Sequence, residues 1–190
     1  MKREEAVVKL RATRRQLYEA LSGIVDEDLV RPNAVGKWTI KDLLGHLAAW
    51  DEETLRVIQA FIMQSEPVYS YTISERGEFA VWNAEQITAR QDHSLEAIRN
   101  ELDNARRDLI QVIQGVSDQV LLRSKMTPWG RSRTSLELLD ELAAHDLEHA
   151  KDVQSWRKKR DRWARARQKY VSKRREGKKK GAEEEPTAEE

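Results

Sequence analysis

Residues 39–63 read TIKDLLGHLAAWDEETLRVIQAFIM, which is the pattern of one long amphipathic helix. Thr39 followed three residues later by an acid, Asp42, is the signature of a capped helix start. Apolar residues recur near the helical period as far as the end of this stretch, so they form one apolar face. His46 lies on that face, so we expect its side chain to point inward or into a cleft. The apolar residues of the face are Leu43, Leu47, Trp50, Leu55, Ile58 and Ile62.

Three other segments have the pattern of long helices. The first spans residues 3–21, and a Pro-containing segment at 30–36 separates it from the helix just described. The second begins after Ser94 and ends at Gly115, which are favourable residues for the two ends of a helix. The third opens at a capping box in residues 134–137 and contains two histidines.

The connections between these helices include a shorter helical piece at residues 79–90. Residues 65–77, which contain Pro, Ser and Tyr, and residues 126–131 are interpreted as loops, and no segment has the alternation of a convincing strand. Four long helices without a sheet predict an all-α four-helix bundle. In such a bundle, cofactor and metal sites form between facing helices.

The composition excludes several classes of protein. The 190 residues include no cysteine, so disulfides, cysteine–zinc sites and a protein thiol nucleophile are excluded. No run approaches the roughly 18 to 20 apolar residues of a membrane-spanning helix. Residues 1–17 carry acids and lack the apolar block of a signal peptide. We therefore expect a cytoplasmic protein without a membrane partner.

Charge is distributed unevenly along the chain. Residues 157–190 hold 14 Lys/Arg and seven Asp/Glu, a net charge of about +7, which leaves about −6 for the residues before them. We expect three parts: a four-helix bundle over residues 1–157, a basic helical extension over 158–180 and an acidic disordered tail over 181–190.

The basic extension has two interpretations. A Lys/Arg-rich end with an acidic terminus is most simply a solvated, self-screening segment. The alternative is a nucleic-acid partner bound through residues 157–180, where Trp163 and Tyr170 are interleaved with basic residues.

The sequence HDLEH at residues 145–149 places two histidines four residues apart in the last helix. This spacing puts both imidazoles on one helical face, where they can bind one ion at about 2.0 to 2.1 Å, and a third ligand must come from another helix. His46 is the best third ligand because it lies on an apolar face, whereas His93 stands among polar residues at a helix start. Such a site keeps positions open for water.

Simpler interpretations exist for the same residues. A histidine pair on a charged helix is often solvated, and a histidine on an apolar face is often a core residue, but their joint occurrence in one bundle favours a metal site. Asp42 lies one turn from His46 and is expected to hold its second nitrogen. Glu141 and Asp152 flank the pair on the last helix and are expected to do the same there.

The segment His145-x-x-Glu148-His149 also fits the inverted zincin pattern, in which the glutamate is the general base of a metallopeptidase. The chain argues against that function, because those enzymes have a third ligand well downstream and only the charged tail follows His149. Glu148 is turned about 100° from His149 around the helix. It is a weak candidate for proton transfer, and no catalytic residue is assigned.

The segment WTIKDLLGHLAAWD at residues 38–51, together with HDLEH at 145–149, resembles the DinB/YfiT-like superfamily of four-helix-bundle metalloproteins over about residues 3–157. The resemblance implies a metal-dependent hydrolase, or a transferase that uses a low-molecular-weight thiol, acting on a small-molecule substrate, and frequently a homodimer. It also implies a divalent metal, often zinc or nickel, held with water by three histidines, which here are His46, His145 and His149.

Two further segments, Trp82-Asn83-Ala84 and Pro128-Trp129-Gly130, are similar to the ClbS/DfsB branch of that superfamily. This similarity implies an alternative function, self-resistance or sequestration of a reactive compound without metal turnover. A histidine at position 145 departs from that branch, in which the position is commonly another residue. We expect the substrate pocket to be lined by Trp38, Trp50, Tyr71, Asn83 and Trp129.

Overall fold

The computed structural model describes residues 1–64, 66–69 and 76–183, and of residues 76–77 and 175–183 it describes the backbone alone. The chain divides into two units, Met1–Val153 and Gln154–Glu190. An antiparallel hairpin of two short strands, β1 (Lys125–Met126) and β2 (Ser132–Arg133), precedes the last helix. The helices are α1 (Arg3–Leu21), α2 (Asp26–Leu29), α3 (Ile40–Met63), α4 (Arg76–Ala89), α5 (Leu95–Gln114), α6 (Asp118–Leu121) and α7 (Ser135–Glu183).

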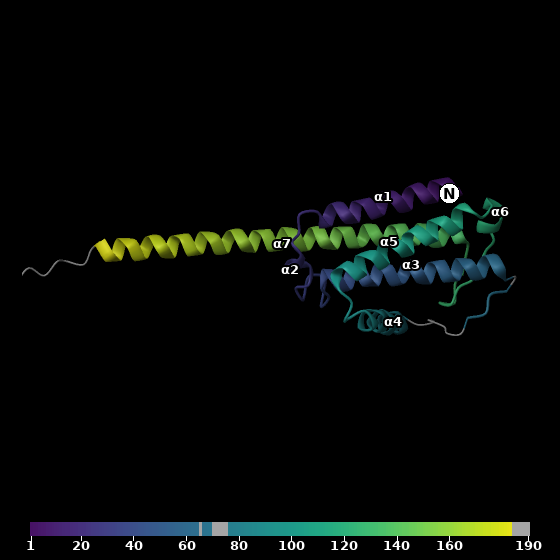
Figure 1. The fold of residues 1–190 in the computed structure, drawn as a ribbon, viewed down its shortest axis with the longest axis horizontal. Helices are drawn as coiled ribbons and strands as arrows, with labels where there is room; N and C mark the ends of the chain where they lie inside the picture. The colour runs from purple at the N-terminus through teal and green to yellow at the C-terminus, as the bar shows by residue number, and fades with distance from the viewer. Residues whose placement is uncertain (65, 70–75, 184–190) are drawn as a thin grey trace, which may run out of the picture. The chain divides into compact units, whose positions relative to one another are not determined.

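Four long helices build the first unit, namely α1, α3, α5 and the part of α7 up to Val153 (Figure 1). The predicted all-α four-helix bundle is confirmed. Within the unit, α3 packs against both α5 and α4, and α1 packs against α5. The helix α3 is therefore the element around which the bundle is arranged.

The predicted helix ends are confirmed where capping residues mark them. The Thr39 hydroxyl accepts from the backbone N–H of Asp42, and the Asp42 carboxylate accepts from the backbone N–H of Thr39, both at 2.9 Å. Thr134 and Glu137 form the same reciprocal pair at the start of α7. Ser94 caps α5 by accepting from the backbone N–H of Ala97. Each such cap stabilises a helix by about 1 kcal/mol.

The core of the first unit is aliphatic, and all four long helices contribute to it. Leu10 of α1, Ile58 of α3, Leu109 of α5 and Leu139 of α7 are fully buried in one cluster. Burial of a large aliphatic side chain stabilises a fold by roughly 1.5 to 3 kcal/mol. The contribution of α3 to this cluster includes Ile58, which lies on the predicted apolar face of residues 39–63, and also Val57 and Phe61, which that prediction did not include.

Some connections differ from the sequence expectation. Residues 126–131 were expected to be a loop; residues 127–131 are the loop of the hairpin β1–β2, but Met126 belongs to β1, because strands this short produce no alternating pattern. The short helices α2 and α6 are likewise too short for a periodic signal. Of the expected loop at 65–77, only part lies within the described residues, and Tyr71 lies outside them.

The helix α7 continues without interruption from the first unit into the second and remains helical to Glu183. Residues 184–190, which belong to the expected acidic tail, lie outside the described residues. The boundaries expected after residues 157 and 180 remain predictions. Among the described residues, no helix combines the length and the apolar character needed to cross a bilayer.

Candidate metal centre

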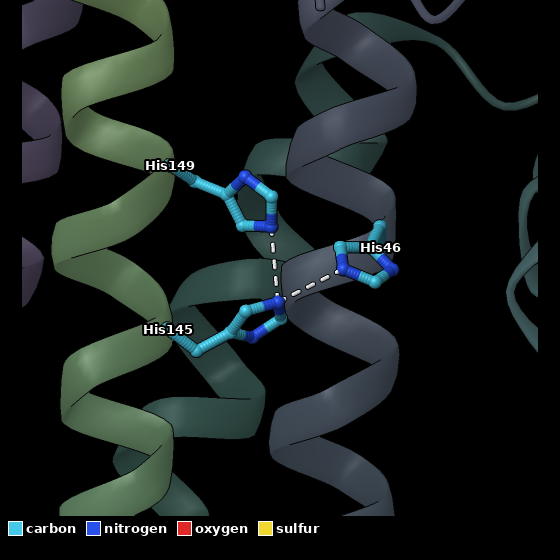
Figure 2. A group of neighbouring side chains, drawn as sticks. All are labelled: His46, His145 and His149. Atoms are coloured by element: carbon cyan, nitrogen blue, oxygen red, sulfur yellow. Dashed lines mark hydrogen bonds between the residues drawn. The ribbon is translucent and has the colours of Figure 1, made fainter. Parts of the chain in front are cut away.

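Three histidine side chains meet inside the first unit (Figure 2). His46 projects from α3, and His145 and His149 project from consecutive turns of α7. The Nε2 atom of His145 lies 3.0 Å from the Nε2 of His46 and 3.0 Å from the Nε2 of His149. Within the described residues, these three form the one group of histidine and carboxylate side chains with the proximity of a metal site.

These distances fit a shared ion. Two nitrogens that bind one ion at about 2.05 Å and subtend an angle of about 90 to 109° lie about 2.9 to 3.4 Å apart. Both measured separations, at 3.0 Å, fall in that interval. Three neutral imidazoles offer one lone pair each, and a set of nitrogens without thiolates suits zinc, nickel or copper.

Burial keeps two of the imidazoles in the neutral form that binds metals. It lowers the pKa of His46 to about 2, with further lowering by the neighbouring His145 and His149. Burial also lowers the pKa of His145 to about 4, again assisted by His149. A charged imidazolium has no lone pair to donate, so neutral rings near pH 7 are a requirement of the site.

The Nδ1 atoms of His149 and His46, the second nitrogen of each ring, have different surroundings. Nδ1 of His149 lies 2.9 Å from a carboxylate oxygen of Asp152, which is the contact that the sequence analysis expected. Nδ1 of His46 is buried and has no hydrogen-bond partner within the described residues. The Asn83 side chain is the one influence that raises the pKa of His46 against burial. If His46 held a metal through Nε2, its Nδ1 would carry the proton.

Two of the expected carboxylates have other roles. The Asp42 carboxylate closes the capping box of α3 and does not hold His46, because the backbone N–H of Thr39 takes it. Glu141 accepts from Nε of Arg133 at 2.7 Å and does not contact the histidines, since the strand β2 brings that guanidinium to it. The spacing along each helix predicted where both acids would lie. It did not reveal the partners that compete for their carboxylates.

The three histidines lie on the wall of a cavity of about 630 Å³. Its wall includes four of the five side chains expected to line a pocket, and the fifth, Tyr71, lies outside the described residues. The cavity is lined by Trp38, His46, Trp50, Thr54, Phe79, Asn83, Trp129, Arg131, Leu138, Glu141, Leu142, Ala144, His145, Glu148 and His149.

Trp50 organises the aromatic part of this wall. Its indole N–H donates to the side-chain oxygen of Asn83 at 3.0 Å, which fixes the ring. Its ring centroid lies 4.4 Å from that of Trp82, 5.9 Å from that of Phe79 and 6.1 Å from that of Trp129. These separations are typical of favourable aromatic contacts, and the Trp50 ring also lies 6.5 Å from that of His46, so an apolar wall adjoins the histidines.

Charged side chains occupy the more exposed parts of the wall. Arg131 is exposed, and its guanidinium makes no hydrogen bond or ion pair with the described residues. Glu148 is exposed as well and lies on the wall beside the two histidines of α7. Among the described residues, Arg131 is therefore a cation of the cavity wall without an ion-pair partner, whereas the neighbouring Arg133 is paired with Glu141.

Directly behind the histidines lies a buried ion network that the sequence analysis missed. Arg14 of α1 and Arg106 of α5 both contact Asp51 of α3 and Asp146 of α7, at 2.8 to 3.1 Å for the closest atoms. All four side chains are at most 6% exposed. Each guanidinium also donates to a backbone carbonyl, that of Leu102 or Leu10.

This network ties together the two helices that carry the three histidines. Asp51 follows His46 by five residues on α3, and Asp146 follows His145 directly on α7. Burial lowers the pKa of Arg14, but the attraction of the two carboxylates outweighs it and the pKa is raised, so the Arg14 guanidinium stays charged.

A sequence signal for the network exists. Arg14 stands between Leu10 and Leu17 on the apolar face of its helix, at a position where a charge is unexpected. Arg106 stands in the same relation to Leu102 and Leu109. A basic residue in phase with buried leucines on two helices indicates buried carboxylate partners.

Comparisons with known proteins place this geometry in context. The sequence model of the DinB superfamily matches residues 9–153. Among curated proteins, none matches the chain in sequence.

Several solved structures share the fold at low identity. The colibactin self-resistance protein ClbS, solved with a dsDNA, has 14% identity and a TM-score of 0.69, covering 83% of this chain and 96% of its own. YfiT from Bacillus subtilis has 15% identity and a TM-score of 0.65, covering 84% and 87%. A mycothiol-dependent maleylpyruvate isomerase has 18% identity and a TM-score of 0.66, covering 80% of this chain. This chain spans 61% of the length of the isomerase.

Proposed function

The chain belongs to the DinB superfamily, and we propose that it is a metal-dependent enzyme, a hydrolase or a small-thiol-dependent transferase, that acts on a reactive small molecule. The observation that carries this proposal is the convergence of three imidazole Nε2 atoms on the wall of a cavity of about 630 Å³. A cavity of that size accommodates a small organic ligand. Donor atoms that a ligand can reach favour a catalytic role over a purely structural one.

The proposed ligands are His46, His145 and His149, and three imidazoles suit zinc or nickel. When bound, such an ion supplies Lewis acidity, which lowers the pKa of a water molecule or an added thiol and polarises an electrophilic substrate. The chain contributes neutral rings and a fixed orientation. Burial keeps His46 and His145 unprotonated, and Asp152 holds Nδ1 of His149.

The cavity wall favours a substrate with an apolar, preferably aromatic, body and an anionic group. Trp50, Phe79 and Trp129 offer ring faces for the body. The guanidinium of Arg131, which has no partner in the part of the chain that the structure describes, offers two parallel donors to a carboxylate. Glu148 lines the same cavity and is the carboxylate to test for proton transfer.

Relatives of the same fold support the two reaction classes. YfiT is described as a probable metal-dependent hydrolase, and the isomerase is described as mycothiol-dependent. This chain has no cysteine, so a thiol would have to come from solution. A homodimer and a cytoplasmic location remain predictions of the family resemblance.

The alternative function is sequestration or self-resistance, in which a reactive compound is bound without turnover. Its support is the similarity in fold to the self-resistance protein ClbS. The structural match covers 96% of the ClbS chain. The three converging histidines favour the metal-dependent enzyme instead, because sequestration by an apolar cavity does not need them.

The first test measures metal content. The purified full chain is loaded with zinc or nickel, desalted and measured by elemental analysis, beside the variants His46→Ala, His145→Ala and His149→Ala. The control is His93→Ala, since His93 is exposed and lies away from the cavity. We expect one bound ion per chain in the wild type and in the control, and loss of the ion in the three variants. Full metal content in the three variants would sink the proposal.

The second test separates turnover from sequestration. The metal-loaded chain is incubated with neutral and carboxylate-bearing aromatic electrophiles, with and without a small thiol. Catalytic loss of the compound over many equivalents supports the enzyme, and a stop at one equivalent supports sequestration. Arg131→Gln should reduce kcat/KM for the carboxylate-bearing compounds by about tenfold and leave the neutral ones unchanged.

A further inference from the structure

The second unit carries two interleaved repeats of seven residues. An aromatic residue recurs at every seventh position. An arginine stands four positions after each of these aromatic residues. At 100° per residue, all six side chains fall within about 80° of arc on one face of α7. We call this face the aromatic–arginine stripe; it consists of Trp156, Arg160, Trp163, Arg167, Tyr170 and Arg174.

The aromatic residues of the stripe are unusually exposed for their size. Trp163 is 72% exposed and Tyr170 is 65% exposed. Exposed rings of this kind mark surfaces that bind partners, because a solvent-facing tryptophan gives no stability to the fold. At the start of the stripe, the guanidinium carbon of Arg160 lies 5.2 Å from the ring centroid of Trp156, a cation–π contact.

The stripe lies on a strongly basic helix. Residues 157–174 hold ten Lys/Arg and one acid, Asp161. The span of about 27 Å therefore lacks the alternating acids that neutralise a solvated, charged helix. Positive charge of this density along one helix attracts a polyanion.

We propose that the aromatic–arginine stripe binds single-stranded nucleic acid. Lysine and arginine side chains contact the phosphates, and unpaired bases stack on Trp163 and Tyr170. Stacking requires bases that are not paired in a duplex, so the exposed rings select a single strand. The stripe lies beyond residue 153, where the match to the DinB superfamily ends, so this activity is independent of the proposed metal chemistry.

The pattern of the stripe argues against two other occupants. A coiled coil with a second copy needs apolar residues three positions after each aromatic, but lysines, Lys159 and Lys173, stand at two of the three positions. A membrane surface needs a continuous apolar face, but Arg167 lies between Trp163 and Tyr170 on the same line.

The test measures binding of the full chain to a labelled oligo-dT of about 20 nucleotides by fluorescence anisotropy, at salt concentrations between about 50 and 200 mM. The double variant Trp163→Ala/Tyr170→Ala should weaken binding by about tenfold or more, whereas Trp163→Phe/Tyr170→Phe should keep the affinity within about threefold. Far-ultraviolet circular dichroism verifies that helix content is unchanged. Equal affinity of the wild type and the alanine variant would overturn the proposal.

A charge-matched pair of variants tests the role of the face. Arg167→Gln/Arg174→Gln removes two charges from the stripe and should lower the slope of log affinity against log salt by about 1.4. Arg162→Gln/Arg165→Gln removes two charges from other faces of the helix and should lower it less. Equal losses, tighter binding of duplex than of single strand, or binding to phosphatidylserine vesicles in place of oligo-dT would each contradict the assignment.

Discussion

The Nε2 atoms of His46 and His145 lie 3.0 Å apart although the two residues are separated by 99 positions and stand on different helices. At this separation the N–H of one neutral ring can donate to the lone pair of the other, and the same spacing also fits two nitrogens bound to one ion. The ion proposed above would be shared by these two nitrogens and that of His149, and it would stabilise the folded state.

Removing metal should lower the stability of the chain. An ion bound at a concentration of about 100 times its Kd stabilises the folded state by about 2.7 kcal/mol, which for a protein of this size corresponds to a Tm change of roughly 5 to 10 °C. Differential scanning calorimetry of the zinc-loaded chain before and after dialysis against a chelator measures this change. In His46→Gln/His145→Gln, the chelator should leave the Tm unaltered. A chelator effect of the same size in that variant would show that the ion binds elsewhere.

The metal-free chain should lose stability as the pH falls from about 7 to 5. The folded pKa values of His46 and His145, about 2 and about 4, lie below the ordinary histidine value near 6.5. In this interval the unfolded chain binds more protons than the folded chain, so the free energy of unfolding falls by about 3.5 kcal/mol for the two histidines together. Urea unfolding at each pH measures this decrease in the free energy of unfolding. The decrease should be much smaller in His46→Gln/His145→Gln, and an equal decrease would assign it to other groups.

Asp146→Asn should be strongly destabilising. It leaves Arg14 and Arg106 buried with one carboxylate between them, and breaking a buried ion pair costs about 3 to 5 kcal/mol. The matched control is Asp140→Asn on the same helix, whose ion pair with Lys9 is about half exposed and contributes about 0 to 1 kcal/mol. Urea unfolding compares the two variants. Similar losses in both would show that the buried network is not a major source of stability.

Asp152→Asn should weaken metal binding by about 10 to 100-fold, because the carboxylate no longer orients His149 through its Nδ1. Its effect on unfolding without metal should be small, since the Asp152 side chain is 42% exposed. Competition with a chromogenic chelator measures the affinity. Asp140→Asn again serves as the control, and an unchanged affinity in Asp152→Asn would remove this acid from the site.

Features that depend on neighbours in the sequence were predictable. The start of α3 at Thr39, the cap of α5 at Ser94 and the opening of α7 at Thr134 all rest on contacts three residues apart. The same short range explains the spacing of His145 and His149, which one helical turn brings together. Residue identity and helical period are enough for such features, because the backbone hydrogen bonds of a helix fix them locally.

Features that depend on the packing of separate helices needed the tertiary structure. The register of α3 against α7 determines that His46 meets the histidine pair, and the same packing buries Arg14 and Arg106 against two carboxylates. Asp42 illustrates the limit of local reasoning: its spacing allows a contact with His46, but the Thr39 cap takes its carboxylate. A helix pattern specifies which face of each helix is buried, whereas the free energy of packing all the faces together selects the partners of each side chain.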